Sequence, residues 1–429
     1  MIRRPASPSE VVNQVSAIHC SFAITGTCTE ESIQNNWNKL MKNYPYCMDY
    51  EWHSGTFDWE NKVLFVSLPE EAKTSINTAL RLILEECYFE AIETRAMGKD
   101  KSALLVCSSM TIEEKEYTLF GMYQCHSKTD FKSVVYLTEE FLNYFDEIYV
   151  GKVLPMGSYY KDIVERRCSP SKERSLELEN EKPRDVVLFN CTRLKGEEPK
   201  YREKRDGLYA QTCGCIKLTE EETSRFIKWC KSHNFSTQAV FWSIQLKVYN
   251  KLFDKQREDA KHIVLMSPFD CRNVLGINTP IIGMFIDAMF PTFPADFLDS
   301  SIEEMASRLS TYIRSLDKLE HPEFDRFRDF CYNGNKQSIA FPHTAFFSNI
   351  AGMKVMERLT STMKERFVDF YLSRFVRRPF ADETVAFSMY SYGFFDGTCD
   401  LIALYNGKVY PEVAERVLNE MKMIINNLQ

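Results

Sequence analysis

A histidine and an aspartate with three residues between them, His126 and Asp130, are the residues of this chain best suited to chemistry. They follow an apolar, aromatic-rich segment, residues 116–124, which predicts a strand. From Phe131 onward apolar residues recur at helical spacing, so the pair lies at a corner between a strand and a helix. Imidazole takes up and returns a proton near neutral pH. We therefore predict that His126 is an acid–base group, and that Asp130 orients it or braces the loop through an arginine elsewhere.

The alternative is a purely structural pair. This spacing of histidine and aspartate occurs by chance in many chains, and a lone histidine beside a strand is more often a satisfied structural residue. The pair therefore needs support from the rest of the sequence before it indicates a reaction.

The composition is typical of a soluble globular protein, with 44% hydrophobic and 26% charged residues. A length of 429 residues is enough for two or three domains. The net charge of −7 argues against a nucleic-acid-binding surface, because phosphate binding needs a basic face. Aromatic residues reach 13%, which indicates either aromatic-lined cavities or a compositional bias.

Cysteine usage and the N-terminal residues bear on the compartment. The 14 cysteines follow no regular spacing and mostly lie in apolar runs. Residues 1–14 are polar, without the apolar core of a signal peptide, and no stretch approaches the length of a membrane span. We therefore predict a cytoplasmic monomer with reduced thiols and no membrane span. Cys213 and Cys215 are too close together and too isolated for a zinc site, so we expect no metal.

Hydrophobic periodicity and capping residues predict alternating strands and helices in both halves of the chain. In the first half, a capping box at Thr27 and Glu30 would open a helix that ends before Pro45. In the second half, a capping box at Thr219 and Glu222 would open another. Further helices are expected at residues 78–91, 236–252, 302–319 and 411–428. Strands are expected at residues 12–25, 48–52, 62–68, 102–108, 116–124, 208–218, 262–267, 345–350, 384–391 and 400–405.

A charged segment rich in proline, residues 166–206, separates the two halves. We predict domains at 1–165 and 207–429 with this segment as the crossover between them. The alternative is a long surface loop inside one domain. Both halves show strand, capped helix, buried helix and strand pair, which suggests two related domains.

Several segments, taken in order, resemble those of the acyltransferases that share an HxxxD motif. This superfamily includes chloramphenicol acetyltransferase, the condensation domains of peptide synthetases, polyketide-associated acyltransferases, alcohol acetyltransferases and the plant BAHD enzymes. The resemblance covers nearly the whole chain and rests on residues 30–46, His126–Asp130, residues 234–242 (NFSTQAVFW), Asp270-Cys-Arg272, Gly283, Ser348-Asn349 and the final strand pair and helix.

The chain also departs from the family pattern. Phe131 stands where a glycine often follows the aspartate, and Cys125 replaces the first of a frequent histidine pair. Met284 stands where the family has asparagine after Gly283, and no DFGWG segment is present. These departures indicate a divergent branch rather than a plant BAHD enzyme.

The resemblance implies an α/β fold of two chloramphenicol-acetyltransferase-like domains, with mixed sheets flanked by helices and an active-site channel at their interface. It implies transfer of an acyl group, which we expect to be acetyl, from acyl-CoA to a hydroxyl or amine of a small molecule. In that reaction His126 would be the general base, and no covalent intermediate on Cys125 is needed. The thioester would be a co-substrate, without any permanently bound cofactor.

The resemblance also implies roles for other residues. Asp130 would pair with Arg272 and hold the loop geometry, while Ser348 and Asn349 would bind substrate or its oxyanion. A basic cluster at Arg374, Arg377 and Arg378 would meet the phosphates of coenzyme A. For these three arginines a solvated surface cluster is the alternative, and for Ser348 and Asn349 it is a core or turn position.

Two other functions stay open at this stage. The first is a condensation-like enzyme that takes its acyl group from a carrier protein. The second is a catalytically inactive module that binds small molecules in the same channel. A thioester hydrolase is disfavoured, because the chain has no Gly-x-Ser-x-Gly segment.

Overall fold

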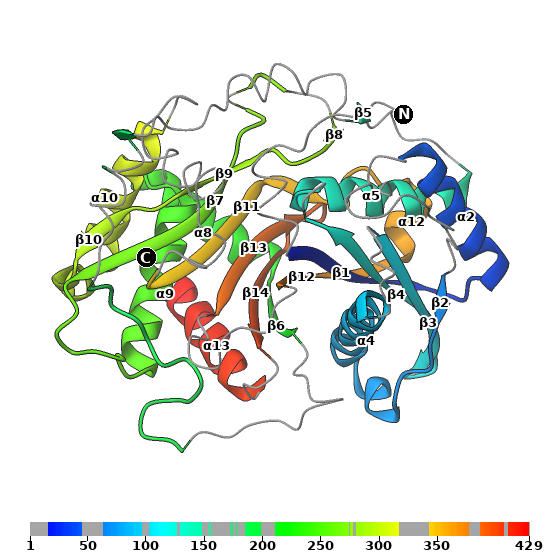
Figure 1. Ribbon diagram of the computed structural model, residues 1–429, viewed down its shortest axis with the longest axis horizontal. Coiled ribbons are helices and arrows are strands. Elements are labelled where there is room, and N and C mark those ends of the chain that lie inside the picture. The colour runs from blue at the N-terminus through cyan, green and yellow to red at the C-terminus, as the bar shows by residue number, and fades with distance from the viewer. Residues whose placement is uncertain are drawn as a thin grey trace.

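Two β-sheets lie side by side in the computed structural model, and helices flank each of them (Figure 1). The five-stranded sheet and its helices form what we call the first lobe, and the seven-stranded sheet and its helices form the second lobe. The structure describes residues 16–44, 63–96, 103–126, 129–147, 154–155, 173–174, 177, 185–198, 211–273, 275–277, 280–316, 343–376, 387–406 and 411–428.

The first sheet contains, in order across it, β12 (Phe367–Val376), β1 (Ser16–Thr25), β4 (Lys115–Cys125), β3 (Ala103–Ile112) and β2 (Leu64–Phe65). Helix α4 (Ile76–Ala96) covers one face, and α5 (Phe131–Asn143) covers the other beside α2 (Glu30–Asn43) (Figure 1). Gly121 lets α4 approach β4 closely, because a Cβ there would lie 2.8 Å from the carbonyl oxygen of Ile83. On the opposite face, the rings of Phe120 and Phe141 of α5 meet edge-on with centroids 5.4 Å apart.

The second sheet contains, in order, β10 (Thr292–Pro294), β7 (His262–Asp270), β11 (Ala345–Val355), β13 (Ser388–Phe394), β14 (Cys399–Asn406) and β6 (Gln211–Leu218), with β9 (Ile286–Met289) paired to β7. Strand β11 runs parallel to β7 and β13, so the sheet is mixed. Its helices are α8 (Glu220–Ser232), α9 (Thr237–Leu252), α10 (Ile302–Ser315) and α13 (Pro411–Asn427). Helix α9 packs on β11, where the rings of Phe241 and Phe347 stack at 4.8 Å.

The second sheet turns its other face toward the first lobe. Phe346, Tyr390 and Ile402 on that face belong to the same hydrophobic cluster as the core of the first sheet. Shorter elements complete the described chain: β5 (Leu154–Pro155), which pairs with β8 (Ile281–Ile282), α12 (Ser361–Arg366), and 3₁₀ turns at Glu70–Thr74, Tyr144–Asp146 and Ala295–Asp299.

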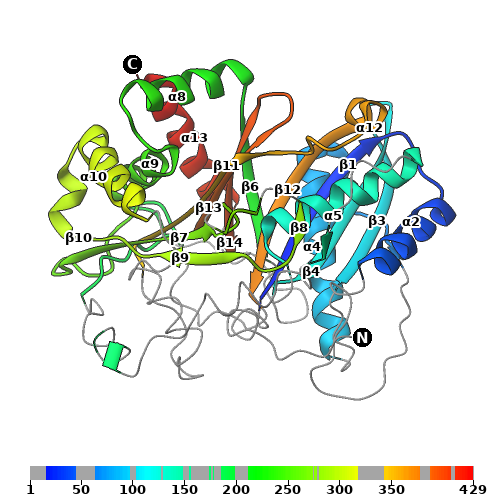
Figure 2. The same cartoon turned by 90° about the horizontal axis from the view of Figure 1, so that it is seen from above.

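Strand β12 joins the two halves of the sequence, because it comes from the second half but lies at the edge of the first sheet. It pairs antiparallel with β1 from Ser16↔Val376 to Ile24↔Phe367. Figure 2 shows β12 beside β1, on the side of the first sheet that faces β6. The first lobe is therefore completed by a segment more than three hundred residues away in sequence.

The expected α/β class, with two mixed sheets flanked by helices, is confirmed. The capping box of Thr219 and Glu222 is also confirmed. The capping box at Thr27 is wrong: Thr29 caps α2, because its side chain accepts a hydrogen bond from the Ser32 backbone N–H. The strand expected at residues 48–52 lies outside the described residues, and strand β12 was not expected.

The boundaries proposed at residues 165/166 and 206/207 lie outside the described residues and stay predictions. Within the crossover, Val187 and Phe189 are buried in the core of the second lobe. No helix of the described ranges is long and apolar enough to cross a membrane.

Candidate active site

His126 follows β4 directly, and only 6% of its surface is exposed. Its ring Nδ1 lies 2.9 Å from the carbonyl oxygen of Thr129. A carbonyl oxygen only accepts hydrogen bonds, so Nδ1 carries the proton and the neutral ring has its lone pair on Nε2. The loop thereby holds the imidazole in the tautomer that accepts a proton at Nε2.

The loop between β4 and α5 is itself fixed at both ends. The backbone N–H and the hydroxyl of Thr129 both donate to the carbonyl oxygen of Cys125, at 3.3 and 3.1 Å. The backbone N–H of Asp130 donates to the carbonyl oxygen of Gly283 in the second lobe, at 3.2 Å. The orientation of the His126 ring therefore depends on a contact between the lobes.

Asp130 is the N-cap of α5. Its Oδ1 accepts hydrogen bonds from the backbone N–H and the hydroxyl of Ser133, at 3.0 and 2.8 Å. A carboxylate at this position satisfies an unpaired N–H of the first turn and interacts favourably with the positive end of the helix dipole. Asp130 thus starts the helix that follows the histidine loop.

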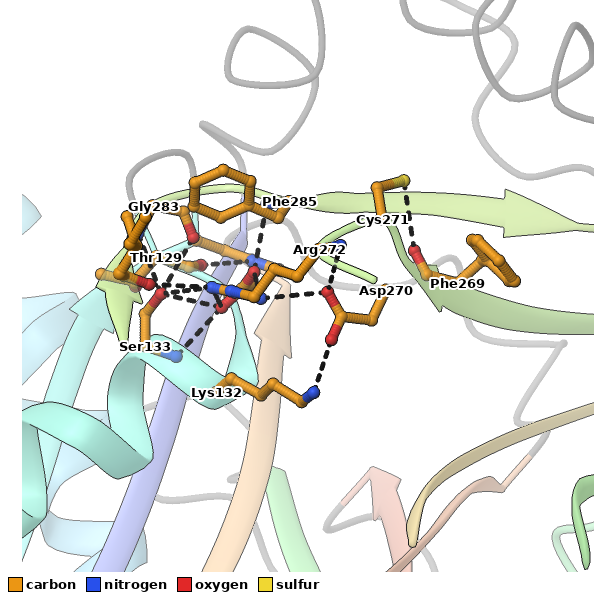
Figure 3. Close-up of polar contacts among 12 residues, drawn as sticks. Thr129, Lys132, Ser133, Phe269, Asp270, Cys271, Arg272, Gly283 and Phe285 are labelled. Carbon is orange, nitrogen blue, oxygen red and sulfur yellow. Dashed lines mark hydrogen bonds and ion pairs between the residues drawn. The ribbon is translucent and has the colours of Figure 1, made fainter. Parts of the chain in front are cut away.

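The same carboxylate pairs with Arg272 of the second lobe through two hydrogen bonds. Nη1 donates to Oδ2 at 2.7 Å and Nη2 donates to Oδ1 at 2.9 Å, with Asp130 and Arg272 only 1% and 3% exposed. The backbone N–H of Phe285 also donates to Oδ2, at 3.0 Å. The Arg272 guanidinium lies over the Phe285 ring, 4.4 Å from its centroid (Figure 3). In the described part of the chain, the hydrogen bonds of this carboxylate come from Ser133, Arg272 and Phe285, so Asp130 braces the loop rather than the imidazole ring.

Burial and the charge of Arg272 act in opposite directions on the pKa of Asp130. Burial alone raises that pKa, because it disfavours the charged carboxylate. The Arg272 charge and the hydrogen bonds from Arg272 and Ser133 outweigh burial, so the pKa of Asp130 is lowered. Burial likewise opposes the charge of Arg272, yet Asp130 and Asp270 keep the pKa of its guanidinium raised.

The charged row continues along the wall of the site. Arg272 Nη1 donates to Oδ1 of Asp270 at 3.2 Å, and the ammonium of Lys132 lies 2.6 Å from Oδ2 of the same carboxylate. Figure 3 shows Lys132 extending from the start of α5 to Asp270 at the end of β7. Acid and base therefore alternate from Asp130 through Arg272 and Asp270 to Lys132, and the row links the two lobes.

A pocket of about 260 Å³ opens between the lobes beside this row. His126 lies on its wall together with Lys132, Asp270 and Ser348, and the remaining lining is mostly apolar. A mainly apolar cavity with a few convergent polar groups is typical of a small-molecule site.

Ser348 and Asn349 of β11 both line this pocket. The Asn349 amide donates to the Thr237 hydroxyl at 2.7 Å, and its oxygen accepts from the Ser391 hydroxyl at 2.9 Å. Its side chain is therefore engaged with α9 and β13. Ser348 points to the other face of the strand, which turns toward His126 and the first lobe. Of the two, Ser348 is better placed to meet a ligand.

The three arginines expected to bind coenzyme A lie at or beyond the end of β12. Arg374 is on β12 opposite Ile18, which lines the pocket, and the Arg374 side chain is outside the described part of the structure. Arg377 and Arg378 lie outside the described residues, so this role stays a prediction.

Phe131 lines the pocket where the resembling enzymes often have glycine. Its ring stacks on Tyr392 at 5.6 Å and meets Phe370 edge-on at 6.4 Å. The aromatic ring therefore fills space between the sheets next to His126 and Asp130. Met284, in place of the family's asparagine, is buried.

Sequence reasoning missed Ser133, Lys132 and Phe285. Ser133 lies three residues after the N-cap Asp130, so its backbone N–H contact follows from the cap, but its hydroxyl contacts with the other lobe do not. The sequence gives no local signal for the contacts of Lys132 and Phe285 with the other lobe, because these contacts depend on which strand ends lie together in the fold.

No family model and no curated protein match the sequence. Solved structures do match it over nearly its full length. The trichothecene 15-O-acetyltransferase TRI3 of Fusarium sporotrichioides has a TM-score of 0.63 at 12% identity, covering 100% of this chain and 95% of that one. Polyketide synthase associated protein 5 of Mycobacterium tuberculosis has a TM-score of 0.57 at 12% identity over 98% of both chains.

The cyclization-docking bidomain of EpoB, a nonribosomal peptide synthetase of Sorangium cellulosum, has a TM-score of 0.64 at 13% identity, covering 99% of this chain and 85% of that one. Further matches include condensation domains. The chain therefore has the two-lobed fold that the acyltransferases resembling chloramphenicol acetyltransferase share with condensation domains.

Proposed function

We propose that this protein transfers an acyl group from an acyl-CoA thioester to a hydroxyl, or an amine, of a small molecule. The observation that carries the proposal is the orientation of the His126 ring and its position on the pocket wall. Its Nδ1 is fixed on the Thr129 carbonyl oxygen, and the ring lies on the wall of the pocket between the lobes. This reaction is favoured by two facts together. A solved acetyltransferase has the same fold, and the tautomer of His126 can accept a proton at Nε2.

In the proposed reaction, Nε2 of His126 removes the proton from the acceptor hydroxyl as its oxygen attacks the thioester carbonyl carbon. The tetrahedral intermediate then collapses, the carbon–sulfur bond breaks, and the imidazolium returns the proton to the thiolate. The products are an ester and free coenzyme A. Proton transfer of this kind contributes about 10²–10⁴-fold to the rate, and binding both substrates in one pocket adds the effect of proximity.

Two other residues have proposed roles in this reaction. Ser348, on the pocket wall, would donate its hydroxyl hydrogen to the developing oxyanion. Asp130 acts at a distance, because its pairing with Arg272 holds the loop that carries His126. Cys125, the last residue of β4, is buried, and the proposed reaction needs no covalent intermediate, so we assign it no role as nucleophile.

Release of free thiol from acetyl-, malonyl- and long-chain acyl-CoA, with a library of alcohols and amines, tests the proposal. We expect one thioester to be consumed, with slow hydrolysis in the absence of acceptor. His126→Ala should lower this rate at least about 10²-fold, whereas His233→Ala, at the end of α8 outside the pocket, should not. Full turnover by the His126→Ala protein would refute the role of His126. No thiol release from any thioester would refute transfer from acyl-CoA and leave a carrier-protein-dependent enzyme or a binding module as the alternatives.

A further inference from the structure

The Lys132–Asp270 ion pair on the pocket wall has hydrogen-bonding capacity that its own contact does not use. The ammonium lies 2.6 Å from Oδ2, and the side chains are 20% and 27% exposed. Oδ2 is buried beneath this contact and, within the described part of the chain, has no hydrogen-bond partner. An ammonium has three N–H donors, and each carboxylate oxygen accepts more than one hydrogen bond. The ammonium can therefore still donate to a third group, and Oδ2 can accept from that group once the ammonium moves aside.

Asp270 has further contacts that hold it besides its ion pair with Lys132. Oδ1 of Asp270 accepts from the backbone N–H and from Nη1 of Arg272, at 3.0 and 3.2 Å. Lys132 reaches Asp270 at the end of a flexible four-carbon side chain. A ligand can thus move the ammonium aside without disturbing the carboxylate.

The charge of the row restricts which group can bind there. Asp130, Arg272, Asp270 and Lys132 are two acids and two bases, so the row carries no net charge. A ligand carboxylate at Lys132 would lie against Asp270, and a ligand ammonium at Asp270 would lie against Lys132, and both arrangements cost energy by like-charge repulsion. A hydroxyl is neutral, and it accepts from the ammonium while donating to the carboxylate.

We infer that the pocket selects acceptors with a second hydroxyl, so that one hydroxyl meets the Lys132–Asp270 pair while the other reaches His126. The substrate class is a small diol or polyol. That one group is an acyl acceptor rests on the proposed function, but the preference for a second hydroxyl is a property of the pocket alone. Both contact points lie on one cavity of about 260 Å³, which suits a small acceptor.

Equilibrium binding without any thioester tests this inference independently of turnover. Two matched probe pairs each differ by one hydroxyl: 1-phenyl-1,2-ethanediol with 2-phenylethanol, and trans-1,2-cyclohexanediol with cyclohexanol. Dissociation constants from ligand-observed NMR should favour the diol by about tenfold or more, the usual effect of a hydrogen bond to a charged group. In Lys132→Met and in Asp270→Asn the preference should fall to about one- to twofold.

Lys251→Met is the matched control. Lys251 also forms an ion pair at 2.6 Å, with Glu420, but that pair lies between α9 and α13 away from the pocket. This variant should keep the full diol preference. Equal binding of both members of each pair, no binding of any diol, or a preference that survives in Lys132→Met would overturn the inference. Loss of thiol release in the assay above, with the diol preference intact, would refute the acyl-transfer proposal alone.

Discussion

Removing the carboxylate of Asp130 should destabilise the protein severely. Five hydrogen bonds end on this carboxylate: two from Ser133, two from Arg272 and one from Phe285. In Asp130→Ala the Arg272 guanidinium stays buried, and among the described residues the more exposed Asp270 is its one remaining anion. Breaking a buried ion pair from one side costs about 3–5 kcal/mol, and loss of an N-cap costs about 1 kcal/mol. The expected loss in free energy of unfolding is therefore about 4–6 kcal/mol.

Urea denaturation followed by tryptophan fluorescence measures this loss, and a double-mutant cycle separates the ion pair from the cap. Replacing both partners, in Asp130→Ala with Arg272→Met, removes the uncompensated charge. The double variant should therefore be more stable than the sum of the single losses predicts, by at least about 1 kcal/mol. Glu70→Ala breaks an exposed ion pair with Lys73 and should cost less than about 1 kcal/mol. A loss below about 1 kcal/mol in Asp130→Ala, or additive single losses in the double variant, would refute the reasoning.

Two further predictions concern packing and pH. Gly121→Ala should cost about 1–3 kcal/mol, because its Cβ would lie 2.8 Å from the Ile83 carbonyl oxygen. Gly393→Ala, with its nearest atom at 3.6 Å, should cost much less, and equal unfolding midpoints for the two variants would contradict the prediction. Burial raises the pKa of Glu139 to about 7, against an ordinary value of 4.5. The stability that the neutral carboxyl contributes is fully present below pH 4.5 and is lost as the pH rises through 7. Across that range, the free energy of unfolding of the wild type should therefore fall by about 3 kcal/mol relative to that of Glu139→Gln. If the free energies of unfolding of the two proteins changed with pH in parallel, the raised pKa of Glu139 would be excluded.

Local patterns in the sequence predicted most elements, because periodicity and caps act within a few residues. The capping box of Thr219 and Glu222 and the apolar face of α13 are of this kind. Strand β12 was missed, because it is defined by pairing with β1 at the other end of the chain. Its sequence, residues 367–376, lacks the strict alternation of apolar and polar residues that predicts a half-buried strand.

In the candidate site, too, local features could be predicted from the sequence and contacts between distant segments could not. His126, Asp130 and Arg272 were found through their resemblance to a motif, and the structure places all three beside one pocket. The pairing of Lys132 with Asp270 was not expected, since α5 and β7 are adjacent only in the folded chain. Ser348 and Asn349 were expected to share one role, and both line the pocket, but the Asn349 side chain is engaged with Thr237 of α9.

Thr129 and Asp130 connect two different kinds of contact. Thr129 precedes Asp130, and its carbonyl oxygen holds the His126 ring, while the Asp130 backbone and carboxylate bind Gly283 and Arg272 of the second lobe. A displacement of the second lobe therefore moves Asp130, then the Thr129 carbonyl, and finally the imidazole. Geometric errors of about 1 Å in a catalytic group can cost about 10²-fold in rate. Weakening the contact between the lobes should thus reduce the proposed activity in protein that is still folded, because Asp130 holds the loop that carries His126.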